Sequence, residues 1–275
     1  MSERSRLDAR LVALGLATGR EKAKELIAAG QVQVNGKTVT KPSAAVTESD
    51  TIVSLQGEPK FVGRGGYKLE KAIAAFGLDL TGLTAADIGA STGGFTQCML
   101  GCGAARVFAI DVGRDQLHPS LRSDERVVCM EQTDIRDREQ IAAHIPDHSL
   151  DFAATDVSFI SLRLVVPAVL PLLKPNAAFV CLVKPQFEAG RKALDKHGVV
   201  KDPADHRRVL EELTLFFAGL RLHTEQLDFS PVCGGDGNIE YLLLLRHCPG
   251  STPTPPSAET LDALVKTAFS TLKGR

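Results

Sequence analysis

The residues with the clearest chemical role lie in a glycine-rich turn between a predicted strand and a predicted helix. An apolar run ends at Asp87, the segment Gly89–Gly94 follows, and Phe95 begins a helical pattern. Glycines let a backbone approach a ligand closely, and the first N–H groups of a helix have no partner inside it. We therefore expect an adenosine-bearing cofactor here, with an ordinary strand–helix turn as the alternative. The candidate cofactor-binding residues are Asp87, Gly89, Ser91, Thr92, Gly93, Gly94 and Phe95.

The spacing of this turn favours S-adenosyl-L-methionine over NAD. A dinucleotide site of the Gly-x-Gly-x-x-Gly type requires a second glycine where this chain has Ser91. Two further acids follow predicted strands. Asp111 stands where a carboxylate would bind ribose hydroxyls, and Asp134 could reach the adenine amino group. Either acid could instead be an ordinary turn residue.

Two lysines and two acids complete the residues that could do chemistry. Lys184 follows the apolar run 179–183, and a lysine is seldom buried without a partner. A lysine at the rim of the fold that extends to water is the alternative. Lys68 lies on a predicted helix, Asp156 ends a predicted strand, and Glu240 begins the last one. By itself, Glu240 resembles any surface residue.

The first 60 residues predict a small α+β domain. Leucines 7, 11, 14 and 16 suggest one helix, and residues 20–29 suggest a second. Asn35-Gly36 between short apolar alternations predicts a hairpin, and residues 51–55 predict another strand. Residues 1–41 hold eight Lys/Arg against four Asp/Glu, which is consistent with a phosphate-binding surface, although composition alone favours a solvated pair of charged helices. The candidate RNA-binding residues are Arg4, Arg6, Arg10, Arg20, Lys22, Lys24, Lys41 and Arg64.

From about residue 61 to 248 the pattern alternates between strands and helices. Strands are expected at 83–88, 106–110, 127–130, 151–155, 178–183, 222–229 and 239–245, and helices at 67–76, 93–102, 161–173 and 205–220. This alternation predicts the α/β class, with a mostly parallel sheet covered by helices on both faces. Ligands of such sheets bind at the carboxyl ends of the strands. The polar segment 188–203 is expected to be a mobile loop.

The composition excludes several other classes of protein. The net charge is −1, 44% of the residues are hydrophobic, and the six cysteines form no Cys-x-x-Cys pair or zinc spacing. We therefore expect no metal. We also expect a cytoplasmic protein, because no signal peptide and no long apolar span are apparent. Residues 249–275 predict a Pro-rich linker and a C-terminal helix, which more often docks on its own domain than on a second copy.

Three motifs in combination resemble the TlyA/hemolysin-A family of ribosomal RNA methyltransferases. They are the segments 87–96, 155–162 and 182–188. Segments 6–8, 19–23 and 32–36 resemble an S4-type RNA-binding domain, and the rest resembles an FtsJ-type 2′-O-methyltransferase. The resemblance implies an S4 domain over residues 1–60. It also implies a Rossmann-like class I methyltransferase domain with a seven-stranded, mostly parallel sheet over residues 61–248.

The resemblance also implies the reaction and its residues. Members of this family carry a Lys-Asp-Lys-Glu tetrad, which falls here on Lys68, Asp156, Lys184 and Glu240. The expected activity is transfer of a methyl group from S-adenosylmethionine to a ribose 2′-hydroxyl of ribosomal RNA, in cytidine. Lys184 would accept the hydroxyl proton or stabilise the developing alkoxide, and the other three side chains would tune and orient it.

Three other functions remain as alternatives at this point. An NAD-dependent oxidoreductase is disfavoured by the missing glycine. A non-catalytic RNA-binding or ribosome-assembly factor is disfavoured by the intact tetrad. A membrane-active haemolysin is disfavoured because no strongly basic amphipathic helix is apparent. The sequence does not select the ribosomal subunit or the nucleotide, and it predicts no oligomer.

Overall fold

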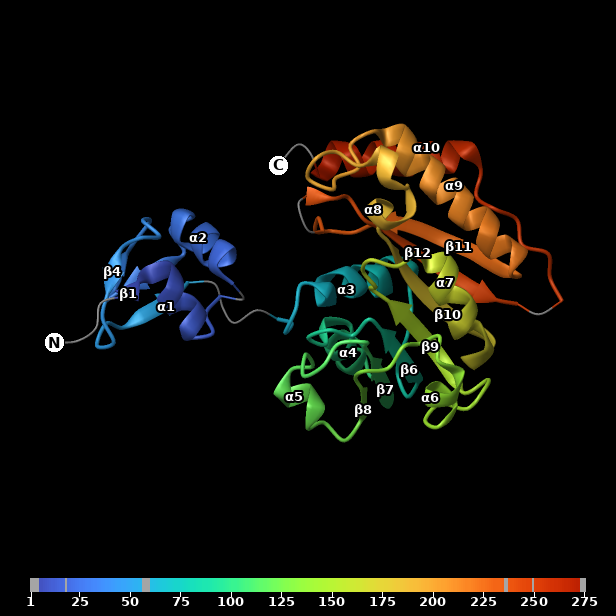
Figure 1. The fold of residues 1–275 in the computed structure, drawn as a ribbon, viewed down its shortest axis with the longest axis horizontal. Coiled ribbons are helices and arrows are strands. Elements are labelled where there is room, and N and C mark those ends of the chain that lie inside the picture. The colour runs from blue at the N-terminus through green and yellow to red at the C-terminus, as the bar shows by residue number, and fades with distance from the viewer. Residues whose placement is uncertain (1–4, 18, 56–59, 235–236, 249, 273–275) are drawn as a thin grey trace. The chain divides into compact units, whose positions relative to one another are not determined.

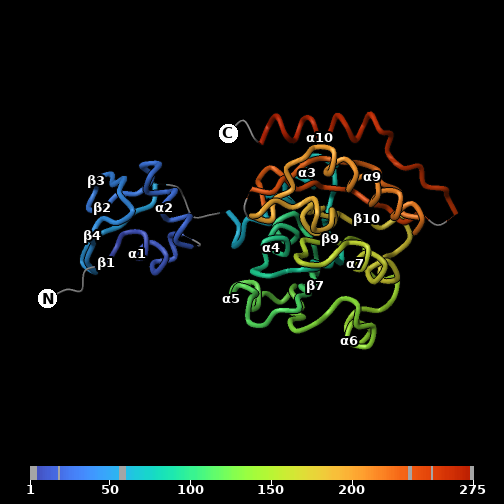
Figure 2. The backbone as a smooth tube through the Cα atoms, turned by 45° about the horizontal axis from the view of Figure 1, so that its top comes forward, coloured from blue at the N-terminus to red at the C-terminus, as the bar shows by residue number. Residues whose placement is uncertain are grey.

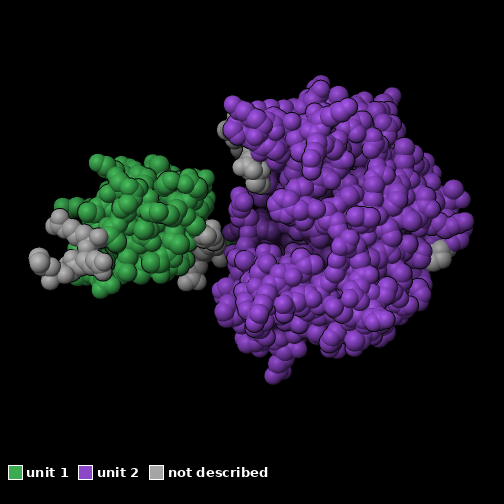
Figure 3. All heavy atoms as spheres, in the orientation of Figure 1, with its two compact units in different colours: residues 1–60 green, residues 61–275 purple. Residues whose placement is uncertain are grey.

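The computed structural model describes residues 5–17, 19–55, 60–234, 237–248 and 250–272. The chain forms two compact units, residues 1–60 and residues 61–275, shown in two colours in Figure 3. Arg4, one of the predicted RNA-binding residues, lies outside the described residues.

Unit 1 is a small α+β domain with its own core. Helices α1 (Leu7–Ala13) and α2 (Arg20–Ala28) share a buried apolar cluster with strand residues such as Val32. The strands form two small sheets. One pairs β1 (Ser5–Arg6) with β4 (Ala45–Val46), and the other has the order β3 (Lys37–Thr38), β2 (Val32–Val34), β5 (Ile52–Ser54).

The Asn35-Gly36 turn explains the predicted hairpin of unit 1. Both residues have positive φ, 51° and 77°, as the turn of a tight hairpin requires. The predicted first helix is wrong in its length. It ends at Ala13, and Gly15 at φ 71° turns the chain, so that Leu14 lies outside it and is 44% exposed.

Unit 2 contains a seven-stranded sheet in the order β11-β12-β10-β9-β6-β7-β8 (Figure 1). Strand β12 pairs antiparallel with both of its neighbours, and every other pair is parallel. The predicted α/β class and mostly parallel sheet are therefore confirmed. The strands are β6 (Thr84–Ile88), β7 (Arg106–Ile110), β8 (Val127–Met130), β9 (Leu150–Thr155), β10 (Leu173–Val183), β11 (Leu222–Phe229) and β12 (Tyr241–His247).

Helices cover both faces of this sheet because successive strand residues point to opposite sides. In β6, Ala85 belongs to one apolar cluster and Ala86 to the other. The first cluster lies beneath α3 (Gly65–Phe76), α4 (Gly94–Gly101) and α5 (Pro119–Arg122). The second lies beneath α6 (Arg138–Ala142), α7 (Leu162–Val169), α9 (Pro203–Gly219) and α10 (Ala258–Leu272). Helix α10 lies along α9 (Figure 2), so the tail packs on its own domain.

The strand order creates a switch point between β6 and β9. The chain leaves β6 to form β7 on one side, and later returns to form β9 on the other. Their carboxyl ends are adjacent, with Gly89 after β6 and Asp156 after β9. A Cβ at Gly89, whose φ is 85°, would lie 2.9 Å from the Asp156 carbonyl oxygen. Only glycine fits here, and the two chain segments that follow these strands therefore meet closely.

Several predictions for unit 2 are wrong in detail, and the predicted strand 239–245, for example, is β12, Tyr241–His247. The predicted helix 161–173 is α7 followed by a 3₁₀ turn, Leu170–Leu172. Strand β10 begins at Leu173, five residues before the predicted start. The predicted loop 188–203 contains a 3₁₀ turn, Arg191–Ala193, and a β-bridge between Leu194 and Val200. It follows a short helix, α8 (Pro185–Glu188).

Candidate active site

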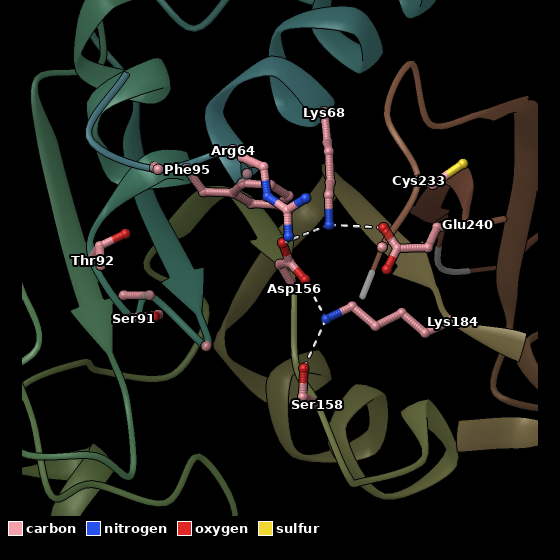
Figure 4. Close-up of a pocket in the computed structure, with 16 residues that line it drawn as sticks. Arg64, Lys68, Ser91, Thr92, Phe95, Asp156, Ser158, Lys184, Cys233 and Glu240 are labelled. Atoms are coloured by element: carbon pink, nitrogen blue, oxygen red, sulfur yellow. Dashed lines mark hydrogen bonds and ion pairs between the residues drawn. The ribbon is translucent and has the colours of Figure 1, made fainter. Parts of the chain in front are cut away.

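The four side chains of the predicted tetrad come together at the carboxyl edge of the sheet (Figure 4). Lys68 projects from α3, Asp156 follows β9, Lys184 follows β10, and Glu240 precedes β12. Lys68 Nζ lies 2.7 Å from Glu240 Oε2 and 3.4 Å from Asp156 Oδ2, and Lys184 Nζ lies 2.6 Å from Asp156 Oδ1. The arrangement is a chain of alternating charges that runs from Glu240 to Lys184.

The tetrad is buried, so its charges depend on each other. Lys68, Lys184 and Glu240 are 7%, 8% and 1% exposed. Burial lowers the pKa of Lys68, but the carboxylates of Asp156 and Glu240 outweigh it and the pKa is raised overall. Burial raises the pKa of Glu240, against the opposing effect of Lys68. Lys68 is therefore a permanent cation that holds two acids in place.

Ser158 is a site residue that sequence reasoning missed. Lys184 Nζ donates a hydrogen bond to Ser158 Oγ at 2.9 Å, so its ammonium has two polar partners. Ser158 stands two residues after Asp156, directly beyond the end of β9. Alternation along an extended chain places residues i and i+2 on the same side, and this signal could have indicated it.

Gly234 is a second residue that the sequence did not indicate. A Cβ at this position would lie 2.2 Å from Glu240 Oε1, although Gly234 has no positive φ. Any side chain here would displace the buried carboxylate. Cys233 and Gly234 line the same pocket as the tetrad.

The glycine turn forms the wall of the pocket opposite Glu240. Gly89, Ala90, Ser91, Thr92 and Gly94 line a cavity of about 330 Å³ that also contains the tetrad. Ser91 and Gly93 have positive φ, 47° and 94°, which turns the backbone sharply into α4. This volume falls within the range of small-molecule sites. The turn and the tetrad therefore face one shared space.

Asp87 lies behind the turn and does not line the pocket that the described residues form. It is fully buried, and its Oδ2 accepts hydrogen bonds from the Thr96 N–H and hydroxyl at 2.8 and 2.7 Å. Burial raises the pKa of Asp87 to about 7. The geometry therefore indicates that Asp87 supports the turn through the first residues of α4, rather than contacting a ligand.

The two acids predicted to bind the adenosine differ in their positions. Asp111 accepts hydrogen bonds from the Ser91 and Gly113 N–H groups at 2.8 and 2.7 Å, so it lies beside the glycine turn. Asp134 forms an ion pair with Arg136 at 2.6 Å. Neither is among the described pocket-lining residues, although Asp111 is joined to one of them.

The predicted RNA-binding residues of unit 1 divide by their partners. Arg6 pairs with the buried Asp8 through two hydrogen bonds, and Arg20 lies 3.8 Å from the same carboxylate. Both guanidinium groups remain more than half exposed. Lys22 pairs with Glu25, and Lys24 pairs with Glu21. Lys41 is exposed, and Arg10 is half-buried on α1. Arg64 lies instead in unit 2, where it lines the pocket.

The glycine turn lies at the switch point of the sheet, beside the ion pairs of the tetrad. This arrangement is typical of Rossmann-like methyltransferases. A model of FtsJ-like methyltransferases matches residues 61–247, and a model of the S4 domain matches residues 5–52. The chain belongs to the FtsJ-like methyltransferase family, and within it to the TlyA/hemolysin-A group.

Relatives along nearly the whole chain support this assignment. The chain is 41% identical over 273 residues to the 16S/23S rRNA (cytidine-2′-O)-methyltransferase TlyA of Mycobacterium tuberculosis, covering 98% of this chain and 99% of that protein. It is 38% identical over 239 residues to Hemolysin A of Brachyspira hyodysenteriae, covering 86% and 98%. A solved structure of a hemolysin candidate from Streptococcus thermophilus has a TM-score of 0.78 and 38% identity, covering 100% and 98%.

Proposed function

We propose that this protein transfers a methyl group from S-adenosylmethionine to the 2′-hydroxyl of a cytidine in ribosomal RNA. The observation that carries the proposal is the position of Lys184, which is buried, held by Asp156, and in the same cavity as the glycine turn. The activity for which the similar TlyA is named supports the choice of substrate. Because ribosomal RNA is the substrate, we also propose a cytoplasmic location and ribosomal subunits as partners.

The residues around the glycine turn fit the cofactor. Each Asp111 oxygen has one backbone N–H partner and keeps a free lone pair that could accept a ribose hydroxyl. Gly89 and Gly94 line the cavity and carry no side chain, so a ligand can approach the backbone of the turn closely. When bound, S-adenosylmethionine supplies a methyl group on a positively charged sulfur to an oxygen nucleophile, whose proton is released.

The tetrad is suited to activating a ribose hydroxyl. A 2′-hydroxyl is a weak nucleophile, so its reaction depends on alignment and on stabilising the charge that develops on the oxygen. The Lys184 ammonium donates one hydrogen bond to Ser158 and forms an ion pair with Asp156, so N–H donors remain for a substrate oxygen. Lys68 and Glu240 hold Asp156 from the other side.

The decisive variant is Lys184→Ala, with Lys174→Ala as its matched control. Lys174 lies on β10, the strand that Lys184 follows, and also pairs with an aspartate, Asp151, at 2.6 Å, but it is not among the described pocket-lining residues. Methylation of ribosomal subunits is measured, and the 2′-O-methyl positions are mapped. We expect Lys184→Ala to lower the rate by about 10²–10⁴-fold, and Lys174→Ala to leave it unchanged. A folded Lys184→Ala variant with near-normal turnover would contradict the proposal.

The name hemolysin, which some relatives carry, raises membrane insertion as a second function. Among the described residues, no helix has the length and hydropathy needed to span a membrane.

A further inference from the structure

The Lys184 ammonium lies between two anchors of different chemistry. Figure 4 shows its Nζ between the Asp156 carboxylate and the Ser158 hydroxyl. The distances are 2.6 Å to Asp156 Oδ1 and 2.9 Å to Ser158 Oγ. The nearest ring, that of Phe187, has its centroid 6.0 Å from Nζ, at the limit of a cation–π contact.

Asp156 alone would not fix the direction of this ammonium. A lysine side chain has four rotatable bonds, and a single ion pair leaves the nitrogen free to pivot about its partner. Asp156 is also shared, because its Oδ2 lies 3.4 Å from Lys68 Nζ. A hydrogen bond to Ser158 at a different angle restricts this freedom, because it directs one N–H while the ion pair holds the nitrogen beside Asp156.

Ser158 is carried by backbone that is itself held in place. The Asp156 N–H donates to the Ile88 carbonyl at 3.0 Å, and Gly89 packs against the Asp156 carbonyl. Three residues after Ser158, the Ser161 hydroxyl donates to Glu188 at 2.7 Å and accepts from the Arg163 N–H at the start of α7. The segment that carries Ser158 is therefore anchored on both sides, at Asp156 and at Ser161.

We propose that Ser158 is a positioning residue which, with Asp156, orients the Lys184 ammonium so that a remaining N–H is directed at the ribose oxygen. This inference rests on the proposed methyl transfer to a ribose. It adds a fifth member to the charged tetrad, one that holds the reacting lysine without contacting the methyl donor. Because Ser158 acts through Lys184, its removal affects the rate of the bound complex rather than the binding of either substrate.

The test compares Ser158→Ala with Ser158→Thr, which keeps a hydroxyl at the same carbon. Ser123→Ala is the control, because Ser123 is an exposed serine whose hydroxyl, among the described residues, donates to the Ser120 carbonyl. Under single-turnover conditions, Ser158→Ala is expected to lower the methyl-transfer rate about 10- to 100-fold, the equivalent of losing one hydrogen bond to a charged group. The affinities for S-adenosylmethionine and for ribosomal subunits are expected to stay within about twofold. Ser158→Thr should recover most of the rate, and Ser123→Ala should retain all of it.

The outcomes separate this inference from the proposed function. If the unmodified protein methylates ribose and Lys184→Ala does not, but Ser158→Ala is within twofold of normal, then only the role of Ser158 is overturned. A change confined to substrate affinity, or a folded Ser158→Thr variant as slow as Ser158→Ala, also overturns it. If the unmodified protein transfers no methyl group to ribosomal RNA, the proposed function itself fails.

Discussion

Asp87 shows how one buried acid can support a binding turn without touching the ligand. Its Oδ2 accepts both Thr96 donors, whereas its Oδ1 has no hydrogen-bond partner among the described residues. A buried carboxylate with an unpaired oxygen is costly in its charged form. The protonated acid is therefore favoured in the folded protein, which explains why its pKa is raised to about 7.

This raised pKa makes the stability of unit 2 depend on pH. Because Asp87 ionises near 4 when unfolded and near 7 when folded, the folded state binds the extra proton between these values. Its contribution to the free energy of unfolding therefore falls as pH rises, by roughly 1.4 kcal/mol per pH unit across that interval. Asp87→Asn removes the titration, so the variant should gain stability relative to the original as pH rises from 5 to 7. Denaturant unfolding at several pH values measures this.

An exposed acid provides the control for that experiment. Asp79 accepts the Thr81 N–H at 2.9 Å, and hydrogen bonds from Thr81 lower its pKa. Above pH 5 Asp79 is charged in both the folded and the unfolded protein. The change in the free energy of unfolding caused by Asp79→Asn should therefore not vary with pH over that range. The same flat behaviour in Asp87→Asn would show that Asp87 is ionised in the folded protein.

Family resemblance predicted the members of the tetrad, and local pattern could not have done so. Lys184 stands out because it ends an apolar strand, but Glu240 has unremarkable neighbours in the sequence. Ser158 was missed because its partner, Lys184, follows a different strand, and Gly234 was missed because its close approach to Glu240 exists only in the folded chain. The assignment of Asp87 to ligand contact was reasonable from its spacing, and only burial indicates its supporting role.

At the scale of elements, apolar runs predicted the central strands well. Strands β6, β7 and β9 are five or six residues long and mostly buried on both faces, which gives a nearly continuous apolar pattern. The start of β10 was missed because Lys174, Pro175 and Asn176 are not apolar. The turn at 194–200 was missed because it is held by side chain–backbone hydrogen bonds. Asp195 accepts from the His197 and Val199 N–H groups, and Lys201 pairs with its carboxylate.

This turn is joined to the segment that carries Glu240. Asn238, which is 2% exposed, accepts from the Val200 N–H and donates to the Gly198 carbonyl, both at 3.2 Å. The buried His206 receives the Tyr241 hydroxyl at Nδ1, since its Nε2 must donate to the Val200 carbonyl. Residues on both sides of Glu240 are thus fixed to the 194–200 turn.

We therefore expect Asn238→Ala to loosen the turn and slow the reaction together. The buried Val200 N–H and the Gly198 carbonyl would lose their partner, at a cost of about 1–3 kcal/mol in the free energy of unfolding. Hydrogen exchange of the Val200 amide should become faster, and methyl transfer should fall because Glu240 is less firmly placed. His197→Ala, on the exposed part of the same turn, should change neither quantity. Unchanged exchange at Val200 in Asn238→Ala would show that the turn is held by other contacts.

At the scale of the whole molecule, we propose that RNA binding belongs to unit 1 and methyl transfer to unit 2, which are separate compact units. Unit 1 has its own apolar cluster, and the two larger clusters lie within unit 2. Several charges of unit 1 are already neutralised within it, such as Lys22 by Glu25. The guanidinium groups of Arg6 and Arg20 share the buried Asp8 and remain exposed, so they are the better candidates for phosphate contact.

Removal of residues 1–60 tests this division. Unit 2 alone is expected to fold and to bind S-adenosylmethionine normally, because the tetrad, the glycine turn and both large apolar clusters belong to it. Its affinity for ribosomal subunits at physiological salt should fall. The dependence of log K on log salt should become less steep by about 0.7–0.9 for each phosphate that unit 1 neutralises in the full chain. In the full chain, Arg20→Ala should reduce the slope by the amount expected for about one phosphate. If the shortened chain bound ribosomal subunits with undiminished affinity, a role of unit 1 in binding RNA would be contradicted, whether or not methyl transfer was retained.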